Sequence, residues 1–274
     1  MDLTDAEFNE IRAIIYSRFG ISLGEQKRSL VLGRLRKLTQ QKGFSSFAEL
    51  VSFVKSDSSG DSMQEMIDRI STNHTYFFRE SQHFDLLSRK VLPELVGQLR
   101  QSRSNDLRVW CAASSTGEEP YSIAMTMMDF LGHEYGSWKA GLLATDVSSR
   151  VIATATRGVY STSQVSNITE THRKRYMQQL DEENWQFRPE IRKEITFRRF
   201  NLMNPVFPFK RPFHIVFCRN VMIYFDIPTR NELIEKIYHI TAPGGYLFVG
   251  HSESIRSSDC PFEYVQPAVF RKRI

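Results

Sequence analysis

Hydrophobic positions in the first 70 residues recur with the spacing of amphipathic α-helices. The first set follows the i, i+3, i+4, i+7 pattern and precedes Gly20, a residue suited to a helix C-terminus; it comprises Phe8, Ile11, Ile14, Ile15 and Phe19. The same periodicity continues over 30–38 and 47–54, and it returns at 63–70 after a turn-rich stretch at 56–61. This part of the chain therefore predicts a small helical unit.

The pattern changes from residue 107 onward, where short apolar runs alternate with helical stretches. We expect strands at 107–113, 141–146, 195–200, 213–218, 246–250 and 268–271, and helices at 118–131, 147–156 and 229–241. Such alternation predicts a mainly parallel sheet covered on both faces. Pro-Gly-Gly at 243–245 predicts a turn before the fifth strand. Residues 160–200 fit this pattern poorly, and we expect an inserted helix at 170–180 and a hairpin at 185–200.

Composition narrows the class of protein. The 274 residues are 41% hydrophobic and 24% charged, as is usual for a globular protein. No apolar run approaches the roughly 18–20 residues that span a bilayer, and the acidic residues 1–7 do not resemble a secretory signal. The three cysteines lack metal-ligand spacing, and the histidines show no H-x-x-x-H pattern. We expect a cytoplasmic protein with reduced thiols, no membrane insertion and no metal.

Positive charge gathers on the second predicted helix, although the net charge is only +5. Residues 27–42 carry six basic side chains and no acidic one, and they include Lys27, Arg28, Arg34, Arg36 and Lys37. The stretch is a solvated helix face, a nucleic-acid surface or a docking surface for an acidic helical partner. The absence of a stacking aromatic residue between positions 27 and 42 disfavours nucleic acid.

The first strand–helix connection carries a candidate ligand site. The strand at 107–113 runs into small residues and then into a helix that begins with Glu118 and Glu119. Ligands of such sheets bind outside the carboxyl ends of the strands. Two acidic residues at a helix N-terminus repel a pyrophosphate and favour a ligand with a cationic end, unless they only stabilise the helix start. Asp146, which ends the next strand, suits a ribose diol or a plain helix N-cap. S-adenosylmethionine combines a nucleoside with a cationic tail.

Five segments, in order along the chain, resemble the chemotaxis receptor methyltransferases of the CheR family. They are NHTYFFRE at 73–80, STGEEPYS at 115–122, ATD at 144–146, CRNVMIYFD at 218–226 and GHSES at 250–254. The resemblance implies an α/β fold: a Rossmann-like S-adenosylmethionine-dependent methyltransferase domain at 73–274, with a small β-subdomain inserted at about 160–200. A small all-α, receptor-docking domain at 1–72 would precede it, and the resemblance favours docking of the basic residues at 27–42 against the acidic receptor helices.

The resemblance also implies an activity. The enzyme would transfer a methyl group from S-adenosylmethionine to glutamate side chains on the cytoplasmic helices of chemoreceptors, leaving S-adenosylhomocysteine, and would act as a monomer in bacterial sensory adaptation. The residues that it places at the cofactor are Asn73, Thr75, Arg79, Glu118 beside the methionine moiety, Asp146 at the ribose, Asn201 and Leu202 beside the adenine, Arg219, Asn220, and Tyr224 near the sulfonium.

The chemistry requires little beyond alignment. A glutamate carboxylate, with a reference pKa near 4.3, is already ionised at neutral pH, so no general base is needed. We expect Arg79 to orient the acceptor carboxylate through its planar guanidinium, unless it is paired with Glu80 or another acid. The chain departs from the family pattern at Ala113-Ser114, where Gly-Cys is frequent, and at Val147-Ser148, where Ile-Asp is commoner. Neither change removes a group that the chemistry requires.

Two other functions stay open. One is a methyltransferase of the same fold that acts on RNA, and the other is a module that binds cofactor or receptor without turnover; the presence of Arg79 and Tyr224 disfavours the second. Members of the family that tether to a receptor C-terminal pentapeptide carry a glycine-containing insertion in the hairpin of the β-subdomain. Residues 181–188 contain no glycine, so we expect methylation that is independent of a tether.

Overall fold

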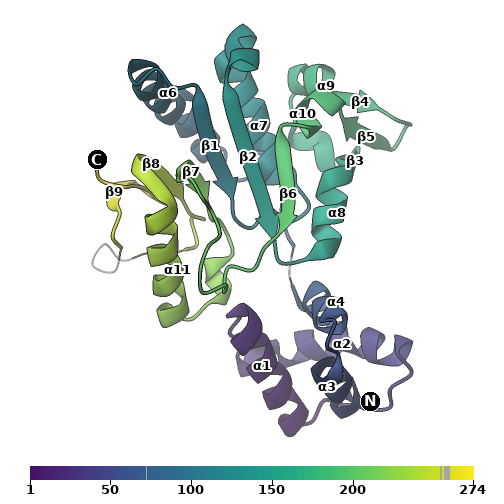
Figure 1. Cartoon of the computed structure of the whole chain (residues 1–274). Helices are drawn as coiled ribbons and strands as arrows, with labels where there is room; N and C mark the ends of the chain where they lie inside the picture. Colours follow the sequence, from purple (N-terminus) through teal and green to yellow (C-terminus); the bar gives the residue numbers. More distant parts are fainter. Residues whose placement is uncertain (72, 254, 256–259) are drawn as a thin grey trace.

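The computed structural model describes residues 1–71, 73–253, 255 and 260–274 (Figure 1). Two positions named above lie outside the described residues: Thr72, the last residue of the expected helical domain, and Ser254, the last residue of the GHSES segment.

The first 70 residues form four α-helices around a hydrophobic core of their own. They are α1 (Asp5–Phe19), α2 (Arg28–Gln41), α3 (Phe47–Ser56) and α4 (Asp61–Ile70), with a short 3-10 turn, η1 (Glu25–Lys27), before α2. Phe8, Ile11 and Ile15 of α1 are buried in this core. Gly20 ends α1 in the left-handed conformation, with φ 69°. The helical unit predicted from the periodicity is confirmed.

A nearly continuous helical segment that the sequence analysis did not predict leads into the sheet. It consists of α5 (Gln82–Leu86), a π-helical turn, η2 (Leu87–Val91), and α6 (Leu92–Gln101). Leu87, Val91 and Leu95 are buried against the first strands and α7 (Glu118–Leu131). Their spacing is the i, i+4, i+8 pattern that would have revealed the helix.

The main sheet has seven strands in the order β6-β2-β1-β7-β8-β10-β9. These are β1 (Asp106–Cys111), β2 (Lys139–Asp146), β6 (Ile195–Arg199), β7 (Phe213–Phe217), β8 (Thr241–Phe248), β9 (Glu263–Gln266) and β10 (Val269–Arg271). The first five in that order run parallel, and the last two add antiparallel pairs at one edge. The expected α/β fold is confirmed.

Helices cover both faces of this sheet because its strands are apolar on both sides. Along β1, Val109 and Cys111 pack in one cluster with α7, whereas Trp110 packs in the other with α11 (Ile227–Ile240). The predicted turn at 243–245 is wrong: β8 begins at Thr241, and its pairing with β7 shifts there, so that these residues bulge out of the strand.

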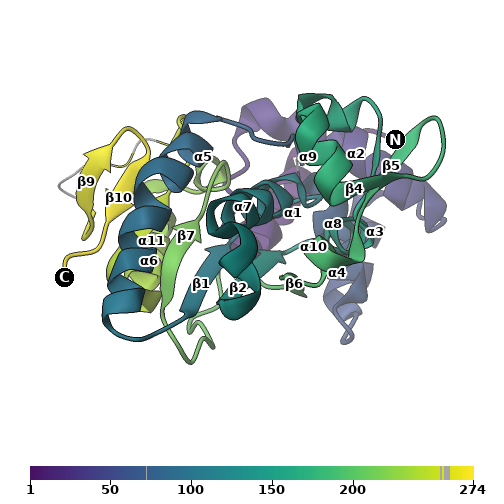
Figure 2. The same ribbon diagram turned by 90° about the horizontal axis from the view of Figure 1, so that it is seen from above.

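A second, three-stranded sheet with the order β3-β5-β4 is inserted after α8 (Ser149–Arg157). It comprises β3 (Val159–Ser161), β4 (Met177–Gln179) and β5 (Asn184–Phe187), with η4 (Gln164–Asn167), α9 (Glu170–Tyr176) and α10 (Pro189–Arg192) around it. The predicted helix at 170–180 ends at Tyr176, and the hairpin expected at 185–200 is wrong, because β5 pairs with β3 and β4 while β6 joins β2 of the main sheet. Seen from above, this small sheet and β9 lie at opposite ends of the molecule (Figure 2).

The helical unit lies beyond the carboxyl ends of β1 and β2 (Figure 1). On one side, the Tyr16 hydroxyl donates to Asp226 Oδ2 at 2.8 Å, and the Ser22 N–H donates to the Tyr224 carbonyl at 2.8 Å. On the other side, the Gln64 side-chain amide donates to the Val147 carbonyl at 2.8 Å. None of the helices in the described part of the chain has the length and apolar character to cross a membrane.

Candidate active site

A cavity lies between the helical unit and the carboxyl ends of β1, β2 and β7, where a parallel sheet binds its ligands. Phe19, Ser22 and Leu30 contribute to its wall from the helical unit. Nine of the ten residues expected at the cofactor also line it: Asn73, Thr75, Arg79, Asp146, Asn201, Leu202, Arg219, Asn220 and Tyr224. The fold thus brings together side chains that lie up to 151 positions apart in the sequence.

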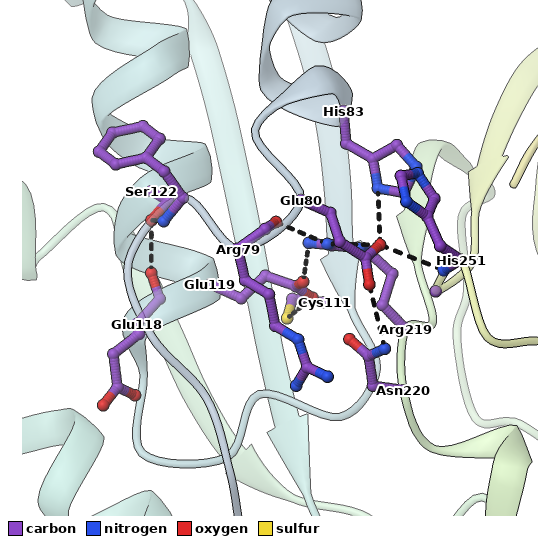
Figure 3. Close-up of polar contacts among 12 residues, drawn as sticks. Arg79, Glu80, His83, Cys111, Glu118, Glu119, Ser122, Arg219, Asn220 and His251 are labelled. Carbon is purple, nitrogen blue, oxygen red and sulfur yellow. Dashed lines mark hydrogen bonds and ion pairs between the residues drawn. The ribbon is translucent and has the colours of Figure 1, made fainter. Parts of the chain in front are cut away.

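Glu118 is the exception among the expected residues. Its side chain is almost fully buried, accepts a hydrogen bond from the Thr116 hydroxyl at 2.6 Å, and is not among the residues that line the cavity. The neighbouring Glu119 lines it instead. Consecutive helical residues point about 100° apart, so only one of the pair can face the cavity. Figure 3 shows the two carboxylates pointing in different directions.

The turn between β1 and α7 packs closely against neighbouring residues at Gly117. Its Gly117 adopts φ 104°, and a Cβ at this position would lie 2.6 Å from the Tyr160 hydroxyl and 2.8 Å from Ala155 Cβ. Ser115 carries a buried hydroxyl that has no hydrogen-bond partner among the described residues, and it lines the cavity. An unsatisfied buried hydroxyl is costly, which favours a polar ligand at this turn.

Asp146 connects this turn to the end of β2. Its carboxylate accepts the N–H groups of Ser115 at 2.9 Å and of Ser148 at 3.0 Å. Burial raises the pKa of Asp146, although these N–H groups act in the opposite direction. The N-cap of α8 is Ser148, so the alternative in which Asp146 is only a helix cap does not hold.

Arg79 has no carboxylate within ion-pair distance in the described part of the chain. Its guanidinium donates to the His74 carbonyl at 2.7 Å and lies 5.9 Å from the centre of the Tyr76 ring. The alternative of an Arg79–Glu80 ion pair is therefore wrong, because Glu80 pairs with Arg219. The charge of Arg79 remains available at the cavity wall.

The guanidinium of Arg219 lies between two carboxylates behind that wall (Figure 3). Its side chain is 0% exposed, and its nitrogens lie 3.0 Å from Glu80 Oε2 and 2.5 Å from Glu119 Oε2. One of these nitrogens also donates to the Arg79 carbonyl at 2.6 Å. Burial alone would raise the pKa of Glu80, but the charge and hydrogen bonds of Arg219, together with hydrogen bonds from the Asn220 amide and the His251 N–H, outweigh it and lower that pKa. One guanidinium and two carboxylates therefore lie together beside the cavity.

Comparison with known proteins identifies the whole arrangement. A family model described as the CheR methyltransferase, SAM binding domain matches residues 73–270, and one described as the CheR methyltransferase, all-alpha domain matches residues 6–71. The chain belongs to the CheR methyltransferase family. Among its relatives, the chemotaxis protein methyltransferase of Borreliella burgdorferi is 40% identical over 99% of this chain and 96% of its own. That of Escherichia coli K12 is 37% identical over 92% of this chain and 85% of its own. The chain is a methyltransferase of chemotaxis, with a domain that binds S-adenosylmethionine.

Some basic side chains in and just before α2 are engaged in hydrogen bonds or ion pairs, and others are exposed. Arg28 pairs with Asp5 at 2.5 Å, and Arg34 donates to the Ser71 carbonyl at 2.8 Å just beyond the end of α4. Arg36 donates to the Met1 carbonyl at 2.6 Å, whereas Lys37 is exposed. Lys27, the last residue of η1 just before α2, lines the cavity. Docking of this CheR methyltransferase through α2 remains a prediction, and Arg34 is engaged in holding α4.

Two clusters of side chains were missed because the fold assembles them from distant segments. Glu253 of the GHSES segment is 7% exposed and accepts the backbone N–H groups of Asn220, Val221 and Met222 at 2.7–2.9 Å. Ligand atoms of Glu80, His83 and His251 lie within 4.8 Å of one another. Because no short spacing links His251 to the other two residues, local patterns in the sequence could not reveal this cluster. The positive charge beside Glu80 is already supplied by Arg219.

Proposed function

We propose that this CheR methyltransferase transfers a methyl group from S-adenosylmethionine to glutamate side chains on the cytoplasmic helices of chemoreceptors. The products are glutamate methyl esters and S-adenosylhomocysteine. The single observation that carries the proposal is the Arg79 guanidinium, which lines the cavity without a carboxylate partner among the described residues. The relatives named as chemotaxis protein methyltransferases support the receptor as the substrate.

The residues of the cavity fit S-adenosylmethionine, which supplies a methyl group on a sulfonium centre. The carboxylate of Asp146 suits the ribose hydroxyls, and that of Glu119 suits the cationic end of the ligand. We assign this second role to Glu119 rather than Glu118, since only Glu119 lines the cavity. Asn201 and Leu202 are assigned to the adenine. The unpartnered Ser115 hydroxyl offers a further hydrogen bond.

The chain contributes alignment and exclusion of water. Arg79 orients the acceptor carboxylate through two parallel N–H groups, which fix a direction that a point charge would not. Tyr224, Asn73 and Thr75 line the same cavity, and we assign them to the site of transfer. Phe19, Leu202 and Val221 give the cavity apolar walls, which keep water away from the ionised nucleophile.

Incubation with methyl-labelled S-adenosylmethionine and a receptor cytoplasmic fragment tests the proposal. We expect label on the receptor that alkaline hydrolysis releases as methanol, since esters are cleaved by base. A fragment whose methylated glutamates are replaced by alanine serves as the matched control and should take up none. Label that enters RNA instead, or no transfer to either acceptor, would contradict the proposal and support one of the two alternative functions.

A further inference from the structure

We propose that Glu80 is a positioning residue for cofactor binding: through Arg219 it orients the Glu119 carboxylate and preserves its negative charge for the ligand's cationic amino-acid end. This inference rests on the proposed function, because it takes S-adenosylmethionine as the ligand.

The first step of the argument is the direction of Arg219. Although Arg219 contributes to the cavity wall, its side chain is 0% exposed, and its guanidinium bonds to Glu80, Glu119 and the Arg79 carbonyl. Arg79 and Glu80 are neighbours in the segment before α5, whereas Glu119 lies in the first turn of α7. Arg219 therefore acts by positioning other groups. The ligand would contact Glu119, which Arg219 positions.

The second step is a count of charge. With two carboxylates around one guanidinium, the cluster carries one negative charge that is not neutralised. Glu119 is the carboxylate that faces the cavity, and it is 12% exposed. With Glu80 uncharged, Arg219 and Glu119 would form a neutral buried pair that offers little to a cation.

The third step is the fixed position of Glu80. This residue adopts φ 56°, outside the usual range for a side-chain-bearing residue. Its carboxylate also accepts from the Asn220 side-chain amide at 3.3 Å and from the His251 N–H at 3.2 Å. On the other side of Arg219, the Cys111 thiol donates to Glu119 Oε1 at 3.3 Å. Both ends of the ion chain are anchored, as Figure 3 shows, so the position of Arg219 between them is determined.

The test compares two ligands in one variant. S-adenosylhomocysteine and 5′-methylthioadenosine share the adenosine, but only the first carries the amino-acid tail. In Glu80→Gln, we expect calorimetry to show that affinity for S-adenosylhomocysteine falls about tenfold or more while affinity for 5′-methylthioadenosine changes less than threefold. An equal loss of affinity for both ligands, or no loss, overturns the inference. A purely structural role would not change the ratio of the affinity for S-adenosylhomocysteine to that for 5′-methylthioadenosine.

Two further variants complete the design. Glu94→Gln removes a carboxylate from an ion pair between α6 and Arg271 of β10, neither of which lines the cavity, and it should leave the ratio of the two affinities unchanged. If Glu80→Gln does not fold, Glu80→Asp replaces it: the shorter carboxylate retracts from Arg219, and the ratio should fall about threefold, whereas an unchanged ratio overturns the inference. Receptor methylation by the unaltered enzyme is measured separately, so failure of the proposed function is distinguished from failure of this inference.

Discussion

Asp146 joins two connections of the fold, and we predict that it also binds the ligand. It accepts N–H groups from Ser115 and Ser148, which belong to the connections after two different strands. We expect Asp146→Asn to preserve the fold and weaken binding of S-adenosylmethionine by about 1–3 kcal/mol, the scale of a lost charge-assisted hydrogen bond. Calorimetry measures this. The control variant Ser148→Ala removes the N-cap of α8. It should lower stability by about 1 kcal/mol and leave the affinity for S-adenosylmethionine unchanged. Unchanged affinity in Asp146→Asn would refute the ribose role.

Arg79 is predicted to act on the acceptor more than on the cofactor. Arg79→Ala should lower turnover at saturating S-adenosylmethionine by roughly tenfold or more, while cofactor affinity falls less, because its proposed partner is the acceptor carboxylate. Arg79→Lys should restore little, since an ammonium cannot reproduce the planar fork. Steady-state kinetics and calorimetry separate the two effects. Receptor methylation by Arg79→Ala at the normal rate would contradict the orienting role.

His83 predicts a loss of stability in mild acid. Burial lowers the pKa of this fully buried histidine to about 3, with Arg219 and His251 acting in the same direction and Glu80 opposing them. Unfolded histidine has a pKa near 6.5, so below that pH only the unfolded chain binds the proton, and stability declines as pH falls from 6.5 towards 3. Between pH 7 and 5.5, the unaltered protein should lose about 1 kcal/mol more unfolding free energy than His83→Leu. Equal losses in denaturant titrations would refute the prediction.

The sequence could nominate most site residues but could not choose between neighbours. Arg79, Asp146 and Tyr224 occupy segments whose type and spacing specify them. The choice between Glu118 and Glu119 depends on where the first turn of α7 begins, and Gly117 at φ 104° determines that. A rotation of about 100° per residue decides which carboxylate faces the cavity, and helix boundaries are the least certain part of a prediction from sequence.

At the scale of elements, the loop after β7 depends on a distant carboxylate. Glu253 accepts N–H groups from three consecutive residues of this loop and a fourth from Gly250. We expect Glu253→Gln to destabilise the protein by about 2–4 kcal/mol, because an amide turns a donor towards these N–H groups and leaves some unpaired. Hydrogen exchange of residues 220–222 should rise. Glu263→Gln, at an exposed ion pair, should change stability by less than about 1 kcal/mol. Unchanged protection in Glu253→Gln would contradict this account.

Elements with a clear period could be predicted, and those stabilised by tertiary contacts could not. The alternation of apolar runs and helices specified β1, α7 and β2 to within a few residues. The strand β5 has no such signal, because its place is set by Phe187, which stacks on Tyr121 with ring centres 4.0 Å apart. Tertiary packing of this kind overrides local preference, which explains why the hairpin at 185–200 was predicted wrongly.

At the scale of the whole molecule, the cavity is completed only when the two parts of the chain meet. The sequence indicated a helical unit and an α/β unit, but not that Phe19, Leu30 and other residues of the helical unit would line the cavity, or that the Ser22 N–H would bond to the Tyr224 carbonyl. These contacts join segments about 200 residues apart and follow from no local pattern. The helical unit therefore forms part of the wall of this cavity.

The exposed cations of α2 lead to the last prediction. Arg36 is 44% exposed and Lys37 is exposed, whereas Arg34 holds the end of α4. The double reversal Arg36→Glu and Lys37→Glu should leave affinity for S-adenosylmethionine unchanged. Receptor methylation should slow about tenfold at low salt, because exposed charges act mainly on the rate of encounter.

Ionic strength separates docking from the other interpretations. The rate of the unaltered enzyme should fall as salt rises, since the Debye length shrinks to about 8 Å at ~0.15 M, and the double variant should lose most of this dependence. Reversal of Arg103 and Lys139, exposed cations at the opposite end of the sheet, is the matched control and should keep it. Parallel salt curves of equal height for all three proteins would support a solvated helix face. Loss of RNA or DNA binding with methylation intact would instead indicate a nucleic-acid surface, and either result would exclude docking through α2.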